Sequence, residues 1–365
     1  MCVAVAEIAK ILCVEEVHPE CLEEYNACRL VPLDKGLSSD GTPGVRPIGV
    51  GEVLRRLIGK LLIHVIKKDI TDAAGPLQTC SGLKAGIEAA IHAMRGKFED
   101  VESEGILLVD AENAFNKLNR KTALENIKVL CPPFYRYLHN TYQKPAQLVI
   151  NDQKKVEIIQ SNEGGTQGDV TAMALYALGI KPLIDYLNNT IDSDKCAQCW
   201  FADDSSAAGK LTEIRKWWDE LHSNGPKYGY HPLPRKTVLI VKQEYYDIAK
   251  EIFKNTEIKI SHTGERHMGA WVGSRAHKEK YVGDKVEKWV EDVKELSRLA
   301  KDEPQAVYAC YTKAIAHRWS YVQRTIPDIK HLFQPLEDTI RENLIPSIIG
   351  RKVNDLERER YLAFQ

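Results

Sequence analysis

The fold is decided by the stretch CWFADDSS, residues 199–206. An apolar run turns back on itself here, with Asp203 and Asp204 at the turn, which is the pattern of a short β-hairpin. A third carboxylate, Asp110, ends the apolar run at residues 105–109. If these strands pair, their backbones lie about 4.8 Å apart and three carboxylates crowd one spot. Like charges that close cannot all stay ionised without help.

Divalent cations supply that help. Two metal ions about 3.5–4 Å apart are a recurring device for in-line phosphoryl transfer. Mg²⁺ takes oxygen ligands, usually one or two carboxylates together with the phosphates of the substrate. The aspartates therefore predict nucleotidyl transfer with two Mg²⁺ ions, for which Mn²⁺ could substitute. The competing interpretation is a polar hairpin turn, where Asp pairs are common.

The composition is that of an ordinary globular protein. The chain has 365 residues, 44% of them hydrophobic, enough for one large or two small cores. Its nine cysteines are scattered, which favours a reduced intracellular setting and leaves nucleus or cytoplasm open. Glu7 and Lys10 interrupt the apolar N-terminus, which predicts a helix and not a signal peptide or membrane span. No membrane contact is expected.

The single pair Cys196-x-x-Cys199 resembles half of a zinc site. A second pair nearby is missing from the sequence, which makes this weak evidence for zinc. The pair also leads straight into the predicted hairpin. We therefore expect both thiols to be packing residues.

Charge is distributed unevenly along the chain, although the net charge is only −1. Between Arg29 and Asp69, eight basic residues stand against four acidic ones, an excess of four. Nucleic-acid binding depends on where such charge lies. Arg55, Arg56 and Lys60 are candidates for phosphate contacts, with a solvated helix face as the alternative.

Hydrophobic periodicity predicts an α+β region followed by a helical one. A hairpin is predicted around a loop at 38–44. Helices are expected at 2–30, 52–70, 86–98, 121–130, 169–187, 211–221 and from 278 onward. Strands are expected at 105–109, 147–150, 156–159, 196–202, 205–208 and 237–241.

Three motifs follow one another in a specific order: LVDAENAF at 108–115, EGGTQGD at 163–169 and FADD at 201–204. In this order and spacing the chain resembles the reverse transcriptase domain of a retroelement, of the non-LTR (LINE-like) type, over roughly residues 28–275. The resemblance implies a right-hand polymerase. Its fingers would span 1–100, its palm, an antiparallel sheet packed on helices, 101–275, and a helical thumb or connection region 276–365.

The resemblance also implies roles for the palm residues. Asp110 and Asp203 would be direct metal ligands, aided by the backbone carbonyl of Ala111, with Asp204 close by. Phe115 would lie beneath the sugar of the incoming nucleotide and exclude a 2′-hydroxyl, selecting deoxynucleotides. The alternative for Phe115 is a core aromatic at the end of a strand.

Further residues match the family's nucleotide and nucleic-acid contacts. Gln167 and Gly168 would position the nucleotide against the template, and the template would pass closely over the glycines of this loop, including Gly165. The remaining matches are Lys35 and Arg46 for the triphosphate, Lys236 as a general acid near the leaving pyrophosphate, and Gly269 and Trp271 in a primer-grip turn.

The predicted function is RNA-directed DNA synthesis from a primer. The partners would be an RNA or DNA template with its primer, dNTPs, and further domains of a larger retroelement protein. One alternative is an RNA-dependent RNA polymerase, against which Phe115 and Ala202 argue, since such enzymes favour a polar residue and a glycine there. The other is a catalytically decayed nucleic-acid-binding remnant, against which the presence of all three carboxylates argues.

Overall fold

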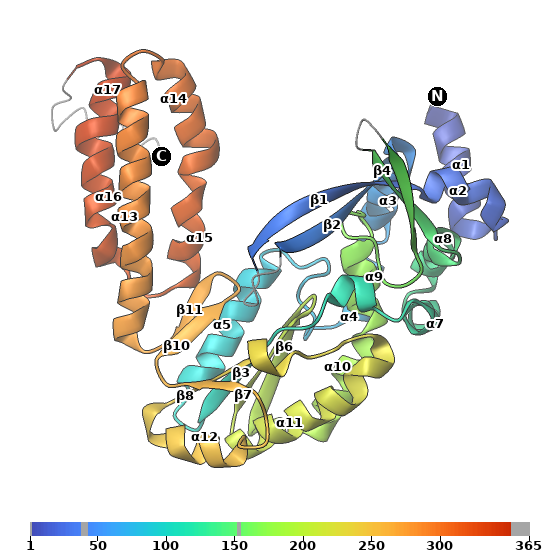
Figure 1. Cartoon of the computed structure of the whole chain (residues 1–365), viewed down its shortest axis with the longest axis horizontal. Helices are drawn as coiled ribbons and strands as arrows, with labels where there is room; N and C mark the ends of the chain where they lie inside the picture. Colours follow the sequence, from blue (N-terminus) through green and yellow to red (C-terminus); the bar gives the residue numbers. More distant parts are fainter. Residues whose placement is uncertain (1, 38–42, 152–154, 352–365) are drawn as a thin grey trace. The chain divides into compact units, whose positions relative to one another are not determined.

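The computed structural model describes residues 2–37, 43–151 and 155–351 and divides the chain into two units (Figure 1). The first unit comprises Met1–Leu239 and Glu244–Ile260, and the second Ile240–Gln243 and Ser261–Gln365. Most of the predicted loop at 38–44 lies outside the described residues. The predicted fingers and palm fall largely in the first unit, and the boundaries given for them stay predictions.

A five-stranded sheet lies mostly in the first unit. Its order is β6 (Cys196–Phe201), β7 (Asp204–Gly209), β3 (Gly105–Val109), β8 (Val238–Val241) and β9 (Lys259–Ser261). Strand β7 runs antiparallel to both β6 and β3. Helices α5 (Gly86–Glu99) and α11 (Leu211–Asn224) pack on this sheet. All five residues of β3 are buried, which explains its uninterrupted apolar sequence.

A second, four-stranded sheet belongs to the same unit. Its order is β2 (Pro43–Gly51), β1 (Cys28–Leu37), β4 (Ala146–Asn151) and β5 (Val156–Ser161). Strands β1 and β2 form the predicted antiparallel hairpin, with a register shift between Asp34 and Gly36. Strands β4 and β5 are also antiparallel, as predicted.

The helix predicted over 2–30 is wrong beyond Val14. Helix α1 spans Cys2–Val14, a short 3-10 turn spans Pro19–Leu22, α2 spans Glu23–Asn26, and β1 begins at Cys28. Pro19 has no backbone N–H and cannot continue a helix, so a new 3-10 turn begins at this residue. The apolar and polar residues at 28–30 alternate over too short a stretch for periodicity alone to distinguish the start of a strand from the end of a helix.

Prolines also begin helices that the sequence pattern did not separate. Helix α7 (Arg120–Leu130) ends where predicted, but α8 (Pro132–Tyr142) starts at the very prolines taken as a stop. The predicted helix at 169–187 is two helices, α9 (Ala172–Gly179) and α10 (Lys181–Thr190). In both cases a proline lies in the first turn, where its missing N–H costs nothing. The other helices of this unit are α3 (Val53–Val65), α4 (Lys67–Ala74), α6 (Ala114–Lys117) and α12 (Tyr246–Ile252).

The second unit is a hairpin followed by a helical bundle. Strands β10 (Gly264–His267) and β11 (Ala270–Gly273) pair antiparallel. The helices are α13 (Arg275–Leu299), α14 (Pro304–Cys310), α15 (His317–Thr325), α16 (Gln334–Thr339) and α17 (Ile345–Ile349), which lie side by side in Figure 1. Trp289 packs against the rings of Trp319 and Phe333, each 6.1 Å away. The predicted fold class, α+β with antiparallel sheets packed on helices and a helical C-terminal region, is confirmed.

Cys196 and Cys199 are buried as free thiols. All nine are free, and burial raises the pKa of Cys196 to about 12 and that of Cys199 to about 11. Because the thiolate is the form that binds metal, this burial favours the packing role predicted for the pair. Within 2–37, 43–151 and 155–351, no helix is long and apolar enough to cross a membrane.

Candidate active site

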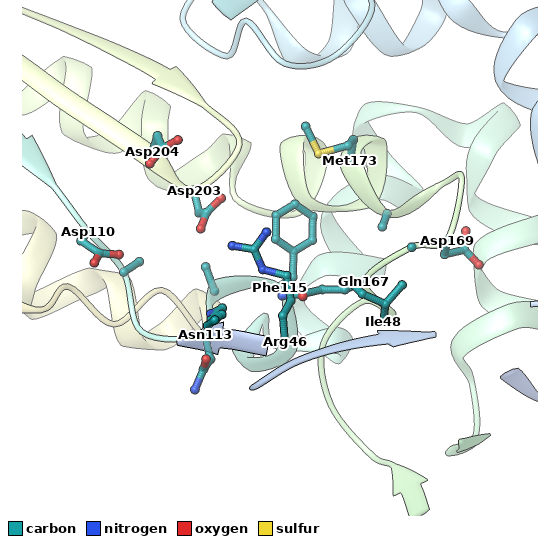
Figure 2. Close-up of a pocket in the computed structure, with 15 residues that line it drawn as sticks. Arg46, Ile48, Asp110, Asn113, Phe115, Gln167, Asp169, Met173, Asp203 and Asp204 are labelled. Carbon is teal, nitrogen blue, oxygen red and sulfur yellow. The ribbon is translucent and has the colours of Figure 1, made fainter. Parts of the chain in front are cut away.

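A cavity of about 610 Å³ opens beside the ends of β3 and of the β6–β7 hairpin. Figure 2 shows Asp110, Asp203 and Asp204 together at one end of it, with Phe115 and Gln167 farther along. Nine of the predicted site residues line this cavity: Lys35, Arg46, Asp110, Ala111, Phe115, Gln167, Gly168, Asp203 and Asp204. Four elements widely separated in sequence thus meet at one place.

Strand register brings the carboxylates together. Val109 pairs with Ser205, so Asp110, the next residue, comes level with Asp204 across the sheet. Phe201 pairs with Asp204, which leaves Ala202 and Asp203 as a two-residue turn. Ala202 adopts a left-handed conformation with φ of 55°, as such tight turns require. The predicted pairing of the two strands that bear the acids is confirmed.

Burial and neighbouring carboxylates raise the pKa of Asp203 and that of Asp204. Desolvation, together with the negative charge of Asp110, raises the pKa of Asp203, while the positive charges of Arg46 and Lys35 act in the opposite direction. Desolvation and the charges of Asp203 and Asp110 raise the pKa of Asp204 to about 6. The ionised forms of Asp203 and Asp204 are therefore unfavourable in the folded protein. Lys35 and Arg46 are the two cations on the same cavity.

This donor set fits hard divalent cations. Three carboxylates share one cavity wall, and their mutual repulsion is what a cation relieves. A β-bridge joins Ala111 to Pro232, but its hydrogen bonds use the carbonyl of Asp110 and the amide of Glu112, not the carbonyl of Ala111. Among the described residues, no three His, Cys, Asp or Glu side chains form a complete metal site, so water or substrate must supply the remaining ligands. Mg²⁺ usually completes such a site with substrate phosphates.

The raised pKa of Asp204 predicts a pH-dependent gain in stability for Asp204→Asn. The carboxyl titrates near about 3.9 when unfolded and at about 6 when folded. Below about pH 4 both states hold the proton, and Asp204 does not change the free energy of unfolding. Between about pH 4 and 6 the unfolded chain ionises while the folded chain stays protonated, so stability falls, and above pH 6 both are ionised and the full loss remains. We expect Asp204→Asn to melt above the parent at pH 7 in metal-free buffer, with the difference vanishing at pH 4. Equal melting temperatures at pH 7 would contradict the assigned charge crowding.

Phe115 lies on the cavity wall and is half-buried. Its ring stacks on that of Tyr176, with centroids 4.7 Å apart and an angle of 27° between the planes. Tyr176 is fully buried on α9, so it forms a rigid support for the Phe115 ring. An aromatic ring held at this position can restrict the shape of whatever binds beside the aspartates.

The loop that contains Gln167 is held by the second sheet. The amide of Gly49 donates to the carbonyl of Gln167 at 2.7 Å, and the Gln167 side-chain amide donates to Asn116 at 3.1 Å. Gly168 has φ of +100°, and a Cβ there would lie 2.9 Å from the Gly49 carbonyl oxygen. Packing within the chain thus accounts for this glycine, whereas the sequence interpretation attributed it to a passing template.

Gly165 lies outside the cavity lining. It is buried, and its amide donates to the Phe115 carbonyl at 2.7 Å. A Cβ at this position would meet the Leu175 side chain at 3.0 Å. Its contacts in the structure are with the protein itself, and a template contact stays a prediction.

Arg55 is not a surface cation, and the expectation that it contacts phosphate is wrong. Its side chain is 1% exposed and forms an ion pair with Asp169, whose side chain is 6% exposed. It also donates to the carbonyl of Asn26 at 2.7 Å. Arg55 therefore joins α3 to the end of the Gln167 loop. Arg56 and Lys60, by contrast, are exposed.

Removing Arg55 should destabilise the protein strongly. Arg55→Ala would leave the Asp169 carboxylate buried without its partner, a loss of about 3–5 kcal/mol. Arg56→Ala, on the exposed face of the same helix, is the matched control and should change stability by no more than about 0.5 kcal/mol. Urea unfolding of both variants measures the difference. Similar midpoints for the two would contradict the buried pair.

Lys236, Gly269 and Trp271 lie outside the cavity lining. Lys236 is exposed at the end of the 3-10 turn Pro234–Lys236. Gly269 and Trp271 belong to the second unit, where the Tyr281 hydroxyl donates to the Gly269 carbonyl at 2.8 Å and the Tyr281 ring packs 5.4 Å from Trp271. The roles given to these three residues stay predictions.

Sequence reasoning missed some of the cavity-lining residues. Asn113 and Met173 line the cavity and appear in Figure 2. Asn113 has a left-handed φ of 44°, which Asn tolerates better than most residues, so an Asn inside the first motif, three residues after Asp110, was a usable signal. Met173 carried no such signal, since it lies within an apolar run.

No protein-family model and no curated protein matches this sequence. Solved structures of telomerase from Candida tropicalis show a distant similarity. The apo enzyme is 12% identical with a TM-score of 0.49, over 95% of this chain and 67% of that one. Apo telomerase truncated from the C-terminal domain gives 12% and 0.47, over 66% and 54%. The complex with a TWJ fragment of telomeric RNA gives 11% and 0.46, over 89% and 58%.

This chain spans about half the length of the truncated telomerase that it matches. All three TM-scores are below 0.5, and all three identities are 12% or lower. Similarity this distant carries no argument about activity. The functional case therefore rests on the cavity and the residues around it.

Proposed function

We propose that this protein is a nucleotidyltransferase that extends a primer with dNTPs on an RNA template. The observation that carries the proposal is the cavity in which Asp110, Asp203 and Asp204 face Lys35 and Arg46. Carboxylates that crowd one another suit a pair of Mg²⁺ ions, and cations opposite them suit a triphosphate. The non-LTR retroelement type and an intracellular location stay predictions.

Each part of the cavity has a task in this reaction. Asp110, Asp203 and the Ala111 carbonyl would hold the metals, with Asp204 adding negative charge beside them. When bound, Mg²⁺ would lower the pKa of the attacking 3′-hydroxyl and offset the charge of the leaving pyrophosphate. Lys35 and Arg46 would hold the triphosphate, and the guanidinium of Arg46 can bind two oxygens at once.

The remaining residues would select the nucleotide. Phe115, supported by Tyr176, would lie against the sugar and leave no room for a 2′-hydroxyl. Gln167, fixed by Gly49 and Asn116, would face the base pair formed with the template. Both residues are held by contacts within the protein, so little ordering would be needed when the substrate binds.

Primer extension tests the proposal. A labelled DNA primer annealed to an RNA template should be lengthened in the presence of dNTPs and Mg²⁺, and not when EDTA is added. A clear preference for ribonucleotides would favour an RNA polymerase instead. If the folded protein binds the template but incorporates no nucleotide with Mg²⁺ or with Mn²⁺, a catalytically decayed binding protein is favoured.

A further inference from the structure

Gln78 is a buried polar residue that lies next to the turn bearing the aspartates. Its side chain is 0% exposed. Its amide nitrogen donates to the Ala202 carbonyl at 3.2 Å, and its amide oxygen accepts from the Ala202 N–H at 2.9 Å. One side chain thus satisfies both backbone groups of the residue that precedes Asp203.

The backbone around Gln78 reinforces this contact. The segment forms a parallel bridge with Trp200, in which Thr79 N–H donates to the Trp200 carbonyl at 2.8 Å and Trp200 N–H donates to the Leu77 carbonyl at 2.8 Å. The segment therefore runs along β6 as far as the turn. Gln78 continues this pairing with its side chain where the backbone of the hairpin bends away.

Tyr230 holds the turn at the next residue. Its hydroxyl donates to the Asp203 carbonyl at 2.9 Å and lies 2.8 Å from Ser205 Oγ. The Tyr230 ring is 0% exposed and packs edge-on against Trp200 at 5.2 Å. Consecutive peptide groups of the turn, those of Ala202 and Asp203, are thus fixed by two buried side chains.

A fixation of this kind is needed because Ala202 is strained. Its φ of 55° is unfavourable for a residue with a Cβ, and glycine would adopt it readily. The hydrogen bonds of the two side chains given above go to backbone atoms of the turn and to Ser205, and neither side chain lines the cavity. Their contribution must therefore act through the position of the Asp203 carboxylate.

We infer that Gln78 and Tyr230 are positioning residues, which hold the strained Ala202–Asp203 turn so that the Asp203 carboxylate is placed to bind metal. This inference rests on the proposed function. Small displacements of a catalytic group can lower a rate by as much as about 10²-fold. Gln78→Leu removes both hydrogen bonds at similar volume, and Tyr230→Phe removes only the hydroxyl.

The matched control is Gln198→Leu. Gln198 is also a buried glutamine, 3% exposed, and its side chain bonds to the Ile184 carbonyl, Trp200 Nε1 and Trp217 Nε1. It lies on β6, and within the described part of the chain these three bonds do not include the turn. Gln198→Leu should lower the melting temperature about as much as Gln78→Leu, because each leaves buried polar groups without partners.

The first measurement is Mn²⁺ binding in the absence of any substrate. The EPR signal of the free ion reports how much Mn²⁺ stays unbound. We expect Gln78→Leu and Tyr230→Phe to bind Mn²⁺ severalfold more weakly than the parent, and Gln198→Leu to match the parent. Asp203→Asn identifies the binding that belongs to the cavity. Unchanged affinity in Gln78→Leu, or no cavity binding by the parent, would overturn the inference.

The second measurement is primer extension. Gln78→Leu should lower kcat by about 10- to 100-fold with KM for the dNTP within threefold, since Lys35 and Arg46 are untouched. Adding Ala202→Gly should restore part of kcat in Gln78→Leu, because glycine needs no support in this conformation, and should not help Gln198→Leu. A fall in kcat no larger than that of Gln198→Leu would overturn the inference. A parent that binds Mn²⁺ but extends no primer would refute the proposed function alone, and the EPR comparison would still decide the role of Gln78.

Discussion

Asp203→Asn and Asp110→Asn should each lower primer extension by roughly 10³-fold or more. Asn keeps the size of the side chain and removes the charge that would hold the metal, whose stabilisation of the transition state is worth several kcal/mol. Single-nucleotide incorporation at saturating dNTP measures the loss. Template binding should change little, because the basic residues proposed to contact phosphate are unchanged.

Folding must be separated from catalysis in this experiment. Both variants should be at least as stable as the parent at pH 7, since each removes one of three charges that repel one another. Asp72→Asn is the control: Asp72 is exposed, pairs with the exposed Lys68, and is not part of the cavity lining. Its activity should match the parent. Asp203→Asn that extends primers near the parent rate would refute the metal assignment.

The catalytic candidates could be predicted because their signal is local. Asp110 ends one apolar run and Asp203 lies between two others, so strand pairing alone brings them together. Lys35, Arg46 and Gln167 needed a resemblance as well, because nothing in their own neighbourhoods specifies a common cavity. In the structure, all five of these residues line the cavity.

The supporting residues could not be predicted in this way. Arg55 has the helical spacing of a surface cation, and its burial follows from a partner, Asp169, 114 positions away. Gln78 forms hydrogen bonds with the backbone of Ala202, which is 124 positions away in the sequence. Their environment is created only when distant segments pack. A single sequence shows the residue type but not the partner, and the partner decides between a solvated charge and a structural one.

Helix boundaries failed for a related reason. Pro132 is predicted to stop a helix and Pro182 to lie inside one, yet each lies in the first turn of a helix. The same residue is tolerated in a first turn and excluded from a helix interior, so the sequence fixes that an interruption occurs but not which side of it is helical.

Phe115→Val should raise ribonucleotide incorporation, relative to deoxynucleotide, by one or more orders of magnitude. The ring lies on the cavity wall and is held there by Tyr176, 4.7 Å away. Shrinking it opens space beside the 2′ carbon and removes a clash of about 1.4–3 kcal/mol, where each 1.36 kcal/mol is a factor of ten. The rate with deoxynucleotides should fall only modestly, because the carboxylates and the triphosphate contacts remain.

A Phe-to-Val substitution in the core is the control that distinguishes the two possible roles of Phe115. Phe134 on α8 is 0% exposed and does not line the cavity. Phe134→Val should lower the melting temperature through the space it leaves in the core and leave sugar preference unchanged. The measured quantity is the ratio of extension efficiencies for dNTP and rNTP in the parent and both variants, alongside melting curves. If Phe115→Val behaves like Phe134→Val, Phe115 is a packing residue. If the parent itself prefers ribonucleotides, the polymerase makes RNA, and the ring at Phe115 cannot be what selects its substrate.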